Sequence, residues 1–334
     1  MSDLVEVLII GVGSIGERHL RCFQASNRAR LSICETNSDL RERIAQQYGI
    51  HQSYSTLDEA LTNPPEAAVI ATPAQLHIPI AHRLAELGVH QLIEKPLSAN
   101  LEGVAELCKV IEQKQIIASV AYVYRAHPAM QAMKEAIASD RFGKPLQLIA
   151  VSGAHFPTYR PAYRQTYYTN HATGGGAIQD AMTHVFNAGE WLVGPIERLV
   201  ADAAHQKLEG VEVEDTVQVL ARHGEVLANY CLNQHQAPTE NTITVVCQNG
   251  TARFEMHNNR WSWMVEPGGV WQDIPSDVPE RDTLFINQAN KFLDAVAEHA
   301  TPACTIQEGM HTLHCNLAAL ESLTHRNWQT VPVE

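Results

Sequence analysis

The chain has 334 residues, too many for one ordinary core and enough for about two domains of roughly 100–200 residues each. Its 45% of hydrophobic and 18% of charged residues are typical of a globular protein. The formal net charge of −13 excludes the broad basic surface that binding to a phosphate backbone requires, and it disfavours docking on anionic membranes. We therefore expect neither nucleic acid nor a membrane as a partner.

The N-terminal sequence MSDLVEVLIIGVG carries no basic segment before its apolar run, and Glu6 interrupts that run. No stretch reaches the roughly 20 apolar residues that a membrane span needs. We interpret this as the absence of a signal peptide or anchor and expect a cytoplasmic protein. Seven cysteines are scattered singly, which favours reduced thiols over a disulfide framework.

Strands and helices alternate in the first 120 or so residues. Short apolar runs predict strands, and the segments between them have helical periodicity. The predicted strands are 5–10, 31–34, 67–71, 91–93 and 116–121, and the predicted helices are 14–25, 39–48, 75–87 and 101–113. Alternation of this kind predicts a parallel, doubly wound sheet.

The pattern changes after Tyr122. A helix over 129–138 and a strand over 146–152 precede a polar aromatic stretch, and a helix over 178–192 follows three glycines. From 196 to 263 the sequence predicts strand after strand, and two helices, 285–299 and 307–325, close the chain. We therefore predict an α/β protein with a Rossmann dinucleotide-binding domain in residues 1–122 and an α+β domain with a largely antiparallel sheet in residues 123–334.

A glycine-rich loop lies between the first predicted strand and helix. It reads Gly11-Val12-Gly13-Ser14-Ile15-Gly16. Gly11 permits a tight turn, Gly13 lets the backbone approach a pyrophosphate, and Gly16 lets helix and strand pack closely. The N–H groups and positive dipole end of the helix would then face the phosphates.

Glu35 ends the second predicted strand, about 20 residues after the loop. A carboxylate at this point accepts hydrogen bonds from the ribose 2′-hydroxyl and repels a 2′-phosphate. We therefore expect NAD as the cofactor and consider NADP less favoured. Arg41 lies six residues further on, where it could reach a 2′-phosphate, although a surface arginine in a first helical turn is the commoner interpretation.

The stretch HQLIEKPLSAN, residues 90–100, places Glu94, Lys95 and Pro96 directly after a predicted strand. The carboxyl ends of the strands in a doubly wound sheet open into the cofactor crevice. A lysine there can donate to a substrate oxygen and stabilise the negative charge that develops on it. Glu94 could orient Lys95 or neighbouring groups, and Pro96 could fix the turn through a cis bond.

Asp180 and His184 lie four residues apart on a predicted helix that follows Gly174-Gly175-Gly176. Positions four apart share one helix face. Histidine titrates near neutrality and suits proton exchange with a hydroxyl group, while Asp180 could bind a second hydroxyl or tune His184. The three glycines would let the backbone pass close to a neighbouring group.

In this order, GVGSIGERH, ATPAQLH, EKP, YRAHPA and GGGAIQDAMTH resemble the glucose–fructose oxidoreductase / inositol dehydrogenase / rhizopine-catabolism oxidoreductase family over essentially the whole chain. The resemblance implies a Rossmann domain followed by a domain whose open sheet packs on the active site and supports homodimers or homotetramers. It implies Lys95, Asp180 and His184 as the catalytic group, with His184 as acid/base. Thr72, Pro73 and His77 match a segment that lines the cofactor, and we expect Glu94 and Lys95 to lie there too.

The sequence departs from the family pattern at Ala74, Val123 and Asn187. The first two departures could alter contacts near the nicotinamide. The third could change hydrogen bonding behind His184 or to the substrate.

The segment HFPTYRPAYRQTYYTNH, residues 155–171, combines tyrosines with two arginines four residues apart. Tyrosine can face a sugar ring, and an arginine fork matches a carboxylate or phosphate. A carbohydrate-type substrate, one that could be anionic, would fit, although a packed surface loop or a subunit contact has equal weight. The residues that we expect to bind substrate, besides Lys95, Asp180 and His184, are Arg125, His155, Tyr159, Arg160, Arg164 and Tyr167.

These features predict an NAD-dependent oxidoreductase that acts on a CH–OH group of a sugar, sugar acid or inositol-like polyol. Two alternatives stay open. One is an NAD-requiring glycosidase that works by transient oxidation, as some members of the resembled family do. The other is a non-catalytic dinucleotide-binding sensor. His311, His314 and Cys315 could share a helix face, but no second group of ligands is evident in the sequence, so we expect no metal.

Overall fold

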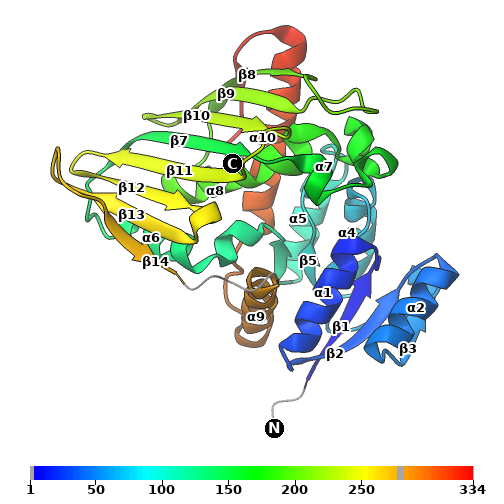
Figure 1. The fold of residues 1–334 in the computed structure, drawn as a ribbon. Helices are drawn as coiled ribbons and strands as arrows, with labels where there is room; N and C mark the ends of the chain where they lie inside the picture. Colours follow the sequence, from blue (N-terminus) through cyan, green and yellow to red (C-terminus); the bar gives the residue numbers. More distant parts are fainter. Residues whose placement is uncertain (1–3, 277–281, 334) are drawn as a thin grey trace. The chain divides into compact units, whose positions relative to one another are not determined.

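The computed structural model describes residues 4–276 and 282–333. The chain divides into two compact units (Figure 1). Unit 1 comprises residues 1–126 and 280–309, and unit 2 comprises residues 127–279 and 310–334. The predicted division at residues 122 and 123 assigned 283–298 to the C-terminal part, whereas this segment groups with unit 1 by its contacts.

Unit 1 is built on a six-stranded sheet with the order β3-β2-β1-β4-β5-β6. All its strand pairs are parallel. The strands are β1 (Val5–Ile10), β2 (Ala29–Cys34), β3 (Gln52–Tyr54), β4 (Ala67–Ile70), β5 (His90–Ile93) and β6 (Ala118–Val120). This is the strand order of a Rossmann fold, and it confirms the predicted fold class. The order reverses between β1 and β4, the point at which doubly wound sheets generally bind their ligands.

The helices of unit 1 are α1 (Ser14–Ala25), α2 (Ser38–Tyr48), α3 (Leu57–Ala60), α4 (His77–Glu86), α5 (Val104–Gln113) and α9 (Thr283–Glu298). Helix α9 packs against α1, where the rings of Phe23 and Phe292 meet edge to face at 6.3 Å. Ala289, Phe292, Leu293 and Val296 of α9 belong to the same buried core as strands β1, β2 and β4. A segment from late in the chain therefore completes the core of the N-terminal fold.

Unit 2 contains a nine-stranded sheet with the order β14-β13-β12-β11-β7-β10-β9-β8-β15. Only β7 and β10 pair in parallel among the described strand pairs of this sheet. The strands are β7 (Pro145–Gly153), β8 (Arg198–Ala204), β9 (Thr216–His223), β10 (Val226–Asn233), β11 (Glu240–Cys247), β12 (Gly250–Glu255), β13 (Arg260–Met264), β14 (Gln272–Pro275) and β15 (Gln329–Thr330). The predicted, mostly antiparallel second sheet is thus confirmed.

Helices cover one face of this sheet. Helix α6 (Pro128–Ala138) packs on β12 and β13, and α8 (Thr183–Val193) packs on β7 and β10 (Figure 1). Alternation along β9 buries Val217, Val219 and Ala221, while Leu220 points away from the helices and is exposed. Helix α10 (Ile306–His325) bonds to α8 through the Asn316 amide, which donates to the Thr183 hydroxyl at 2.9 Å. Unit 2 is therefore a helix-covered sheet with one open face.

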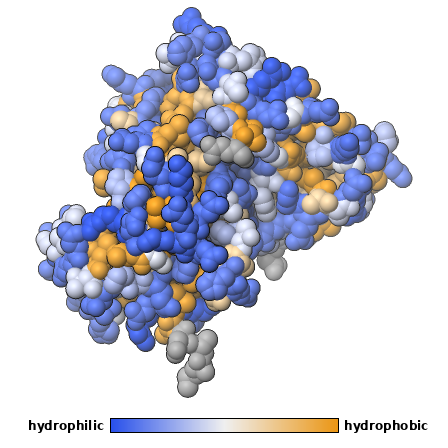
Figure 2. All heavy atoms as spheres, turned by 180° about the vertical axis from the view of Figure 1, so that it is seen from behind, coloured by the Kyte–Doolittle hydropathy of each residue, from blue (hydrophilic) through white to orange (hydrophobic). Residues whose placement is uncertain are grey.

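The surface agrees with the acidic, polar composition. In Figure 2 hydrophilic residues predominate on the face shown, and hydrophobic residues lie between them in separate patches. Most of the apolar side chains are used in the cores instead. Within residues 4–276 and 282–333, none of the helices combines the length and apolar composition that crossing a bilayer requires.

Candidate active site

The glycine loop of unit 1 has the geometry of a dinucleotide site. Gly11 adopts a φ of +81°, which only glycine reaches without strain. A Cβ on Gly16 would lie 1.9 Å from the Gly11 carbonyl oxygen, so this position must be glycine for α1 to pack on the turn. A Cβ on Gly13 would meet no atom of the protein within 4 Å, which leaves open space at the N-terminus of α1. These features suit a pyrophosphate held by backbone N–H groups.

Glu35 lies beside this loop, as its spacing predicted. Its Oε2 accepts a hydrogen bond from the Val12 N–H at 3.1 Å, and its Oε1 accepts one from the Asn37 N–H at 2.9 Å. The carboxylate is therefore fixed next to the phosphate turn. Arg41, which could have reached a 2′-phosphate, donates to the Glu35 carbonyl oxygen at 2.7 Å. Its guanidinium is thus partly used to hold the end of β2.

Arginines that sequence reasoning missed also lie at the loop. A surface pocket of about 590 Å³ is lined by Gly13, Ser14, Arg18, Arg21 and Arg43, among others. Asp282 pairs with Arg18 at 3.5 Å and with the Nη2 of Arg21 at 2.9 Å. Glu17 and Asp282 belong to the same lining, so the three arginines leave only a small excess of positive charge beside Gly13. Sequence spacing could not reveal Asp282 as a partner because it lies 261 residues after Arg21.

The segment after β5 is tied down by two buried histidines. Glu94 bonds to the His19 Nε2 at 2.6 Å and accepts the Lys95 N–H at 3.0 Å. Burial alone would raise the pKa of Glu94, but the bond to His19 and the charges of His19 and Lys95 hold that pKa below its usual value. His77 contacts the Pro96 carbonyl through Nδ1 at 3.0 Å and the Thr72 carbonyl through Nε2 at 2.8 Å.

Lys95 is thus held between fixed neighbours at the carboxyl end of β5. The peptide bond between Lys95 and Pro96 is cis, as the sequence analysis anticipated. Thr72 and Pro73 follow β4, the neighbouring strand, and the backbone of Thr72 is joined to the same turn through His77. Within unit 1 the structure therefore brings together the glycine loop, Glu35 and the turns after β4 and β5 at one edge of the sheet.

Arg125 occupies a different environment from the one expected of a substrate ligand. Its side chain is buried, and its Nη1 donates to Glu308 at 2.6 Å and to the Ala303 carbonyl at 3.0 Å. These contacts use at least part of the guanidinium inside unit 1. The role of Arg125 in binding substrate stays a prediction.

Asp180 and His184 belong to unit 2, where the predicted helix 178–192 is divided. Residues Ile178–Met182 form a π-helical turn and α8 follows from Thr183. Such turns recur at functional sites because the extra residue re-aims side chains. Asp180 is buried, and its Oδ1 accepts a hydrogen bond from the Tyr167 hydroxyl at 2.7 Å.

The three glycines are explained by protein groups that pass close to them. A Cβ on Gly175 would lie 2.3 Å from the Tyr168 carbonyl oxygen, and one on Gly176 would lie 2.6 Å from the Glu214 carboxylate. Gly174 and Gly176 also have φ values of +87° and +84°. The glycines therefore let the 167–171 segment and Glu214 pack against the start of the helix that carries Asp180.

Glu214 caps this helix from a distant part of the chain. Its Oε1 accepts the Ile178 N–H at 2.8 Å, and its Oε2 pairs with the His171 Nε2 at 2.6 Å. The ion pair raises the pKa of His171, and burial of the ring opposes this only in part. Sequence reasoning missed Glu214 because VEVEDTV reads as an ordinary acidic turn. Asn187 is buried one helical turn after His184 and donates to the Thr312 hydroxyl at 3.0 Å.

The tyrosine-rich segment 155–171 is partly a small core. Tyr163 and Tyr168 are buried with Leu208, Val211 and Val213. Tyr159 and Tyr167 remain 62% and 40% exposed. The packing interpretation therefore holds for two of the four tyrosines, while the other two present surface to solvent.

The two arginines and His155 of this segment also differ from one another. Arg164 donates through Nε to the Glu209 carbonyl at 2.8 Å and pairs with the Glu209 carboxylate at 3.3 Å. Arg160 is exposed, and the Nδ1 of His155 lies 2.7 Å from the Thr158 hydroxyl. Arg160 is therefore the better of the two arginines as a ligand for an external anion.

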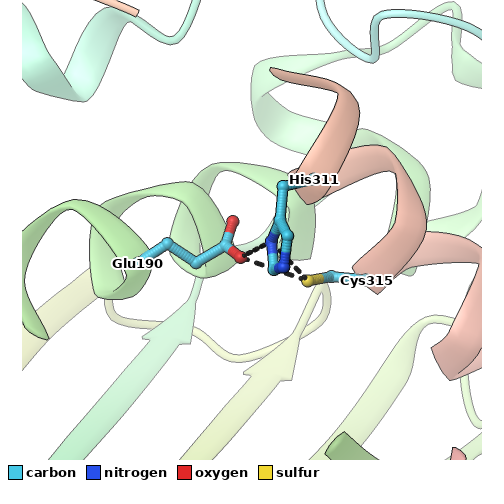
Figure 3. Close-up of side chains that lie close together, drawn as sticks. All are labelled: Glu190, His311 and Cys315. Carbon is cyan, nitrogen blue, oxygen red and sulfur yellow. Dashed lines mark hydrogen bonds and ion pairs between the residues drawn. The ribbon is translucent and has the colours of Figure 1, made fainter. Parts of the chain in front are cut away.

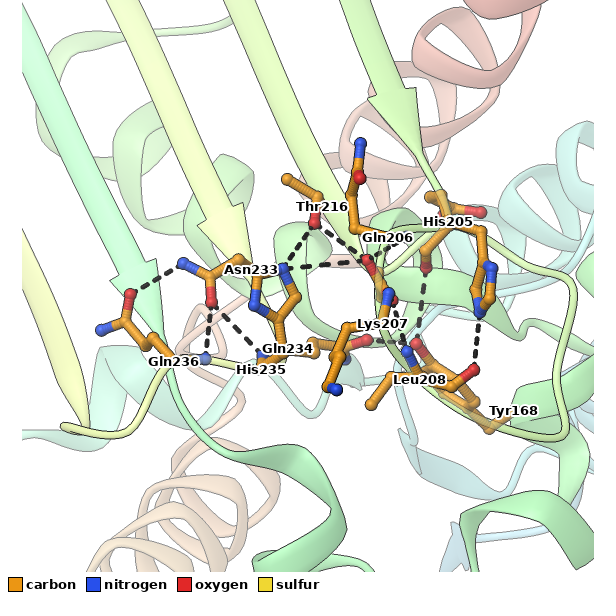
Figure 4. A network of polar contacts seen from close by, with 12 residues as sticks. Tyr168, His205, Gln206, Lys207, Leu208, Thr216, Asn233, Gln234, His235 and Gln236 are labelled. Carbon is orange, nitrogen blue, oxygen red and sulfur yellow. Dashed lines mark hydrogen bonds and ion pairs between the residues drawn. The ribbon is translucent and has the colours of Figure 1, made fainter.

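A network of polar contacts adjoins the small core around Tyr163 and Tyr168 (Figure 4). The fully buried Asp215 accepts the N–H groups of residues 206–208 at 2.7–2.9 Å and the Thr216 hydroxyl at 2.8 Å. Burial alone would raise the pKa of Asp215, but these donors hold it below its usual range. Within the same loop the His205 Nε2 contacts the Leu208 carbonyl at 2.6 Å. The loop that packs on Tyr168 is thereby fixed by one carboxylate.

Comparison with known proteins agrees with both units. Residues 5–122 match the profile described as "Oxidoreductase family, NAD-binding Rossmann fold", and residues 130–253 match the "GFO/IDH/MocA C-terminal domain". The chain belongs to this oxidoreductase family. This Gfo/Idh/MocA protein is thus an NAD-binding oxidoreductase, as its motifs implied.

Named relatives extend over the whole chain. Levoglucosan dehydrogenase of Pseudarthrobacter phenanthrenivorans is 24% identical, with 98% of each chain covered. UDP-N-acetylglucosamine 3-dehydrogenase of Acidithiobacillus ferrooxidans is also 24% identical and covers 95% of this chain and 98% of its own. A solved structure of levoglucosan dehydrogenase in complex with NADH superposes with a TM-score of 0.91 at 22% identity, covering 99% of this chain and 100% of that one. At this identity the structural likeness shows the shared fold.

Proposed function

We propose that this Gfo/Idh/MocA oxidoreductase transfers a hydride between NAD and a hydroxyl-bearing carbon of a sugar, sugar acid or inositol-like polyol. The observation that carries the proposal is the glycine loop with Glu35 fixed beside it, in a chain that matches both family profiles. The names of the relatives support a carbohydrate substrate, because levoglucosan and UDP-N-acetylglucosamine are both sugar derivatives.

The residues of unit 1 fit NAD and would hold it. The N-terminus of α1 and the open space at Gly13 suit the pyrophosphate, and the Glu35 carboxylate suits the ribose hydroxyls. When bound, NAD supplies the hydride acceptor or donor. In our proposal the Lys95 ammonium donates a hydrogen bond to the reacting oxygen of the substrate and stabilises its developing negative charge.

In the same proposal, the residues of unit 2 handle the proton and the substrate hydroxyls. His184 removes the hydroxyl proton during oxidation and returns it during reduction. Asp180 orients a hydroxyl group or the imidazole. The Tyr167 hydrogen bond fixes one oxygen of the Asp180 carboxylate, so its rotamer is set before substrate arrives.

An exposed surface of the 155–171 segment supports a finer assignment of the substrate. Tyr159, Arg160 and Tyr167 are exposed, and Tyr167 contacts Asp180 directly. We propose that Arg160 binds a carboxylate or phosphate of the substrate, with the two tyrosines beside the sugar ring. UDP-N-acetylglucosamine, the substrate named for one relative, carries such charges.

The test combines turnover with cofactor binding. The purified enzyme is mixed with NAD and a panel of neutral sugars, polyols, sugar acids and sugar phosphates, and net NADH is followed by its absorbance. Lys95→Ala and His184→Ala should lower turnover by about 10²–10⁴-fold. Both variants should keep the wild-type Kd for NAD, and the exposed His325→Ala should behave as wild type.

Three outcomes separate the alternatives. Net NADH from an unbroken substrate supports the dehydrogenase. Glycoside cleavage without net NADH would instead support an NAD-requiring glycosidase. Tight NAD binding without turnover on any substrate would favour a sensor, and near-normal turnover by His184→Ala would remove its proposed role.

A further inference from the structure

Three side chains with the chemistry of metal ligands meet between two helices of unit 2. Glu190 projects from α8, and His311 and Cys315 project from α10 (Figure 3). The Cys315 Sγ lies 3.3 Å from the Glu190 Oε1 and 3.8 Å from the His311 Nδ1. The Nδ1 also contacts the same carboxylate oxygen directly. All three ligand atoms fall within 4.8 Å of one another.

The sequence alone indicates the two residues of this cluster that lie on α10. His311 and Cys315 are four residues apart on α10 and therefore share a face. The expectation of no metal rested on the missing second group of ligands, and Glu190 of α8 supplies an oxygen from 121 residues earlier. Of the three residues that the sequence analysis considered, His311 and Cys315 belong to the cluster and His314 does not.

We propose that the Glu190–His311–Cys315 cluster is a binding site for one divalent zinc ion. Carboxylate oxygen, imidazole nitrogen and thiolate sulfur are the ligands that zinc prefers. A glutamate and a cysteine thiolate carry two negative charges, so with a neutral histidine they balance one divalent cation at a site where Cys315 is buried and the other two ligands are partly buried. The three protein ligands leave the fourth tetrahedral position to water.

Two of the three distances between the ligand atoms are close to those of a loaded site. Bond lengths of about 2.0–2.3 Å in a tetrahedral zinc site place two ligand atoms roughly 3.3–3.6 Å apart. The two distances that involve Cys315 are 3.3 and 3.8 Å and need little change. The His311 Nδ1 and the Glu190 oxygen touch through a hydrogen bond and must move apart for an ion to bind both.

Binding exchanges protons for the cation. Burial, with the carboxylate of Glu190 adding to it, raises the pKa of the Cys315 thiol well above its ordinary value, so the thiol is protonated without metal. The ion would bind the sulfur and the Nδ1; the thiol proton would pass to water, and the neutral imidazole would carry its single proton on Nε2. The Thr312 hydroxyl donates to the other oxygen of Glu190 at 2.6 Å and would orient the carboxylate as an outer partner.

A metal-free joint between the helices is the competing interpretation. In it, Glu190 accepts hydrogen bonds from His311, Thr312 and Cys315 and links α8 to α10. These bonds hold the pKa of Glu190 below its usual value although burial opposes them. The zinc interpretation accounts better for the residue types, because hydrogen bonding alone does not require a thiol and an imidazole on the same face.

Direct binding measurements on the full chain decide between the two. The protein is stripped with a chelator, and zinc is titrated in competition with a chromophoric chelator, without NAD or substrate. We expect one zinc ion per chain with a Kd below about 1 µM and affinity that rises with pH. Cobalt at the same stoichiometry should give a thiolate-to-cobalt charge-transfer band.

Variants test the assignment of the ligands. Cys315→Ser should weaken zinc binding by at least about 100-fold and abolish the cobalt band, and Glu190→Gln should weaken binding to a similar degree. Cys231→Ser is the matched control, since it removes a thiol of β10 in the same unit and should leave binding unchanged. Circular dichroism confirms the folding of each variant.

The proposal fails if the stripped wild-type chain takes up no zinc, a result that does not depend on any variant. It also fails if Cys315→Ser and Glu190→Gln bind zinc like the wild type. Because the readout is the metal itself, either result leaves the dehydrogenase proposal untouched, and loss of that proposal would leave this one standing.

Discussion

Removing the carboxylate of Glu214 should loosen the start of the helix that carries Asp180. In Glu214→Ala the buried Ile178 N–H loses its acceptor, and His171 loses its anionic partner. The other contact of this backbone, from the Ala177 N–H to the Glu214 carbonyl at 3.0 Å, does not depend on the side chain. The substitution therefore tests the cap and the ion pair and leaves the backbone hydrogen bond between Ala177 and Glu214 in place.

The two contacts contribute different amounts to the free energy of unfolding because they are buried to different degrees. A buried N–H group left without an acceptor costs about 1–3 kcal/mol. The His171 side chain is 44% exposed, so solvent screens its ion pair and limits it to less than about 1 kcal/mol. Together they predict a loss of about 1–4 kcal/mol, which corresponds to a fall in Tm of roughly 2–16 °C for a unit of this size.

The pH dependence separates the two contributions. Glu214 raises the pKa of His171. The stability that this ion pair adds is therefore present in full below the ordinary histidine pKa of about 6.5, and it disappears as the pH rises through the raised value. The hydrogen bond from the Ile178 N–H to Glu214 does not involve the His171 proton, so it adds no dependence of this kind.

Thermal unfolding between pH 5.5 and 9 measures both terms. Glu214→Gln keeps an acceptor for the Ile178 N–H and should be less destabilised than Glu214→Ala. His171→Gln loses only the ion pair and should differ from wild type at low pH alone. Equal Tm values for wild type and Glu214→Ala at every pH would refute the reasoning, and so would a loss in His171→Gln that grows with pH.

Further substitutions test the glycine loop, the cofactor preference and the substrate anion. Gly13→Ala should keep the wild-type Tm but weaken NAD binding, because its methyl group enters the open space at α1, whereas Gly16→Ala should lower the Tm because its methyl group collides with the Gly11 carbonyl. Calorimetry measures the Tm and titration measures the affinity for NAD. A Gly13→Ala enzyme with normal NAD affinity would contradict the placement of the pyrophosphate. Wild type should bind NAD more tightly than NADP, and Glu35→Gln should reduce the ratio of the two Kd values measured by isothermal titration. Tighter binding of NADP than of NAD by the wild type would refute the role of Glu35. Arg160→Ala should raise KM for an anionic substrate at least about tenfold and leave the Kd for NAD unchanged. Arg164→Ala, the matched control tied to Glu209, should change KM less, and unchanged KM in Arg160→Ala would assign the segment to packing.

Local patterns were sufficient to predict the elements of unit 1 that carry apolar runs. Strand β1 and the glycine loop were found because the hydrophobic run, the turn glycines and the helix follow one another directly in the sequence. Strand β3 was missed, since Gln52, Ser53 and Tyr54 form a three-residue edge strand that buries none of its side chains fully. An edge strand of this kind leaves no apolar signal to find.

The contacts of the site were harder to foresee than its elements. Glu35 was found because a fixed spacing links it to the glycine loop. Glu214 acts on partners 36 and 43 residues away, Asp215 on backbone N–H groups 7–9 residues away and Glu190 on partners 121–125 residues away, and each reads locally as an ordinary surface carboxylate. Pairing across such separations is set by tertiary packing, which a single sequence does not display. The π-helical turn at Asp180 was missed for a similar reason, because its periodicity differs from that of an α-helix by less than one residue per turn.

Helix α9 gives the chain an unusual order of assembly. Its apolar side chains complete the core of unit 1, yet about 160 residues, most of them in unit 2, separate it from the end of β6. On the ribosome, the N-terminal strands therefore emerge long before the helix that covers them, and Phe23 has no Phe292 to pack against until α9 has been made. A fragment that stops at residue 126 should expose this apolar surface and aggregate, whereas the same fragment joined by a short linker to residues 282–309 should fold and remain in solution.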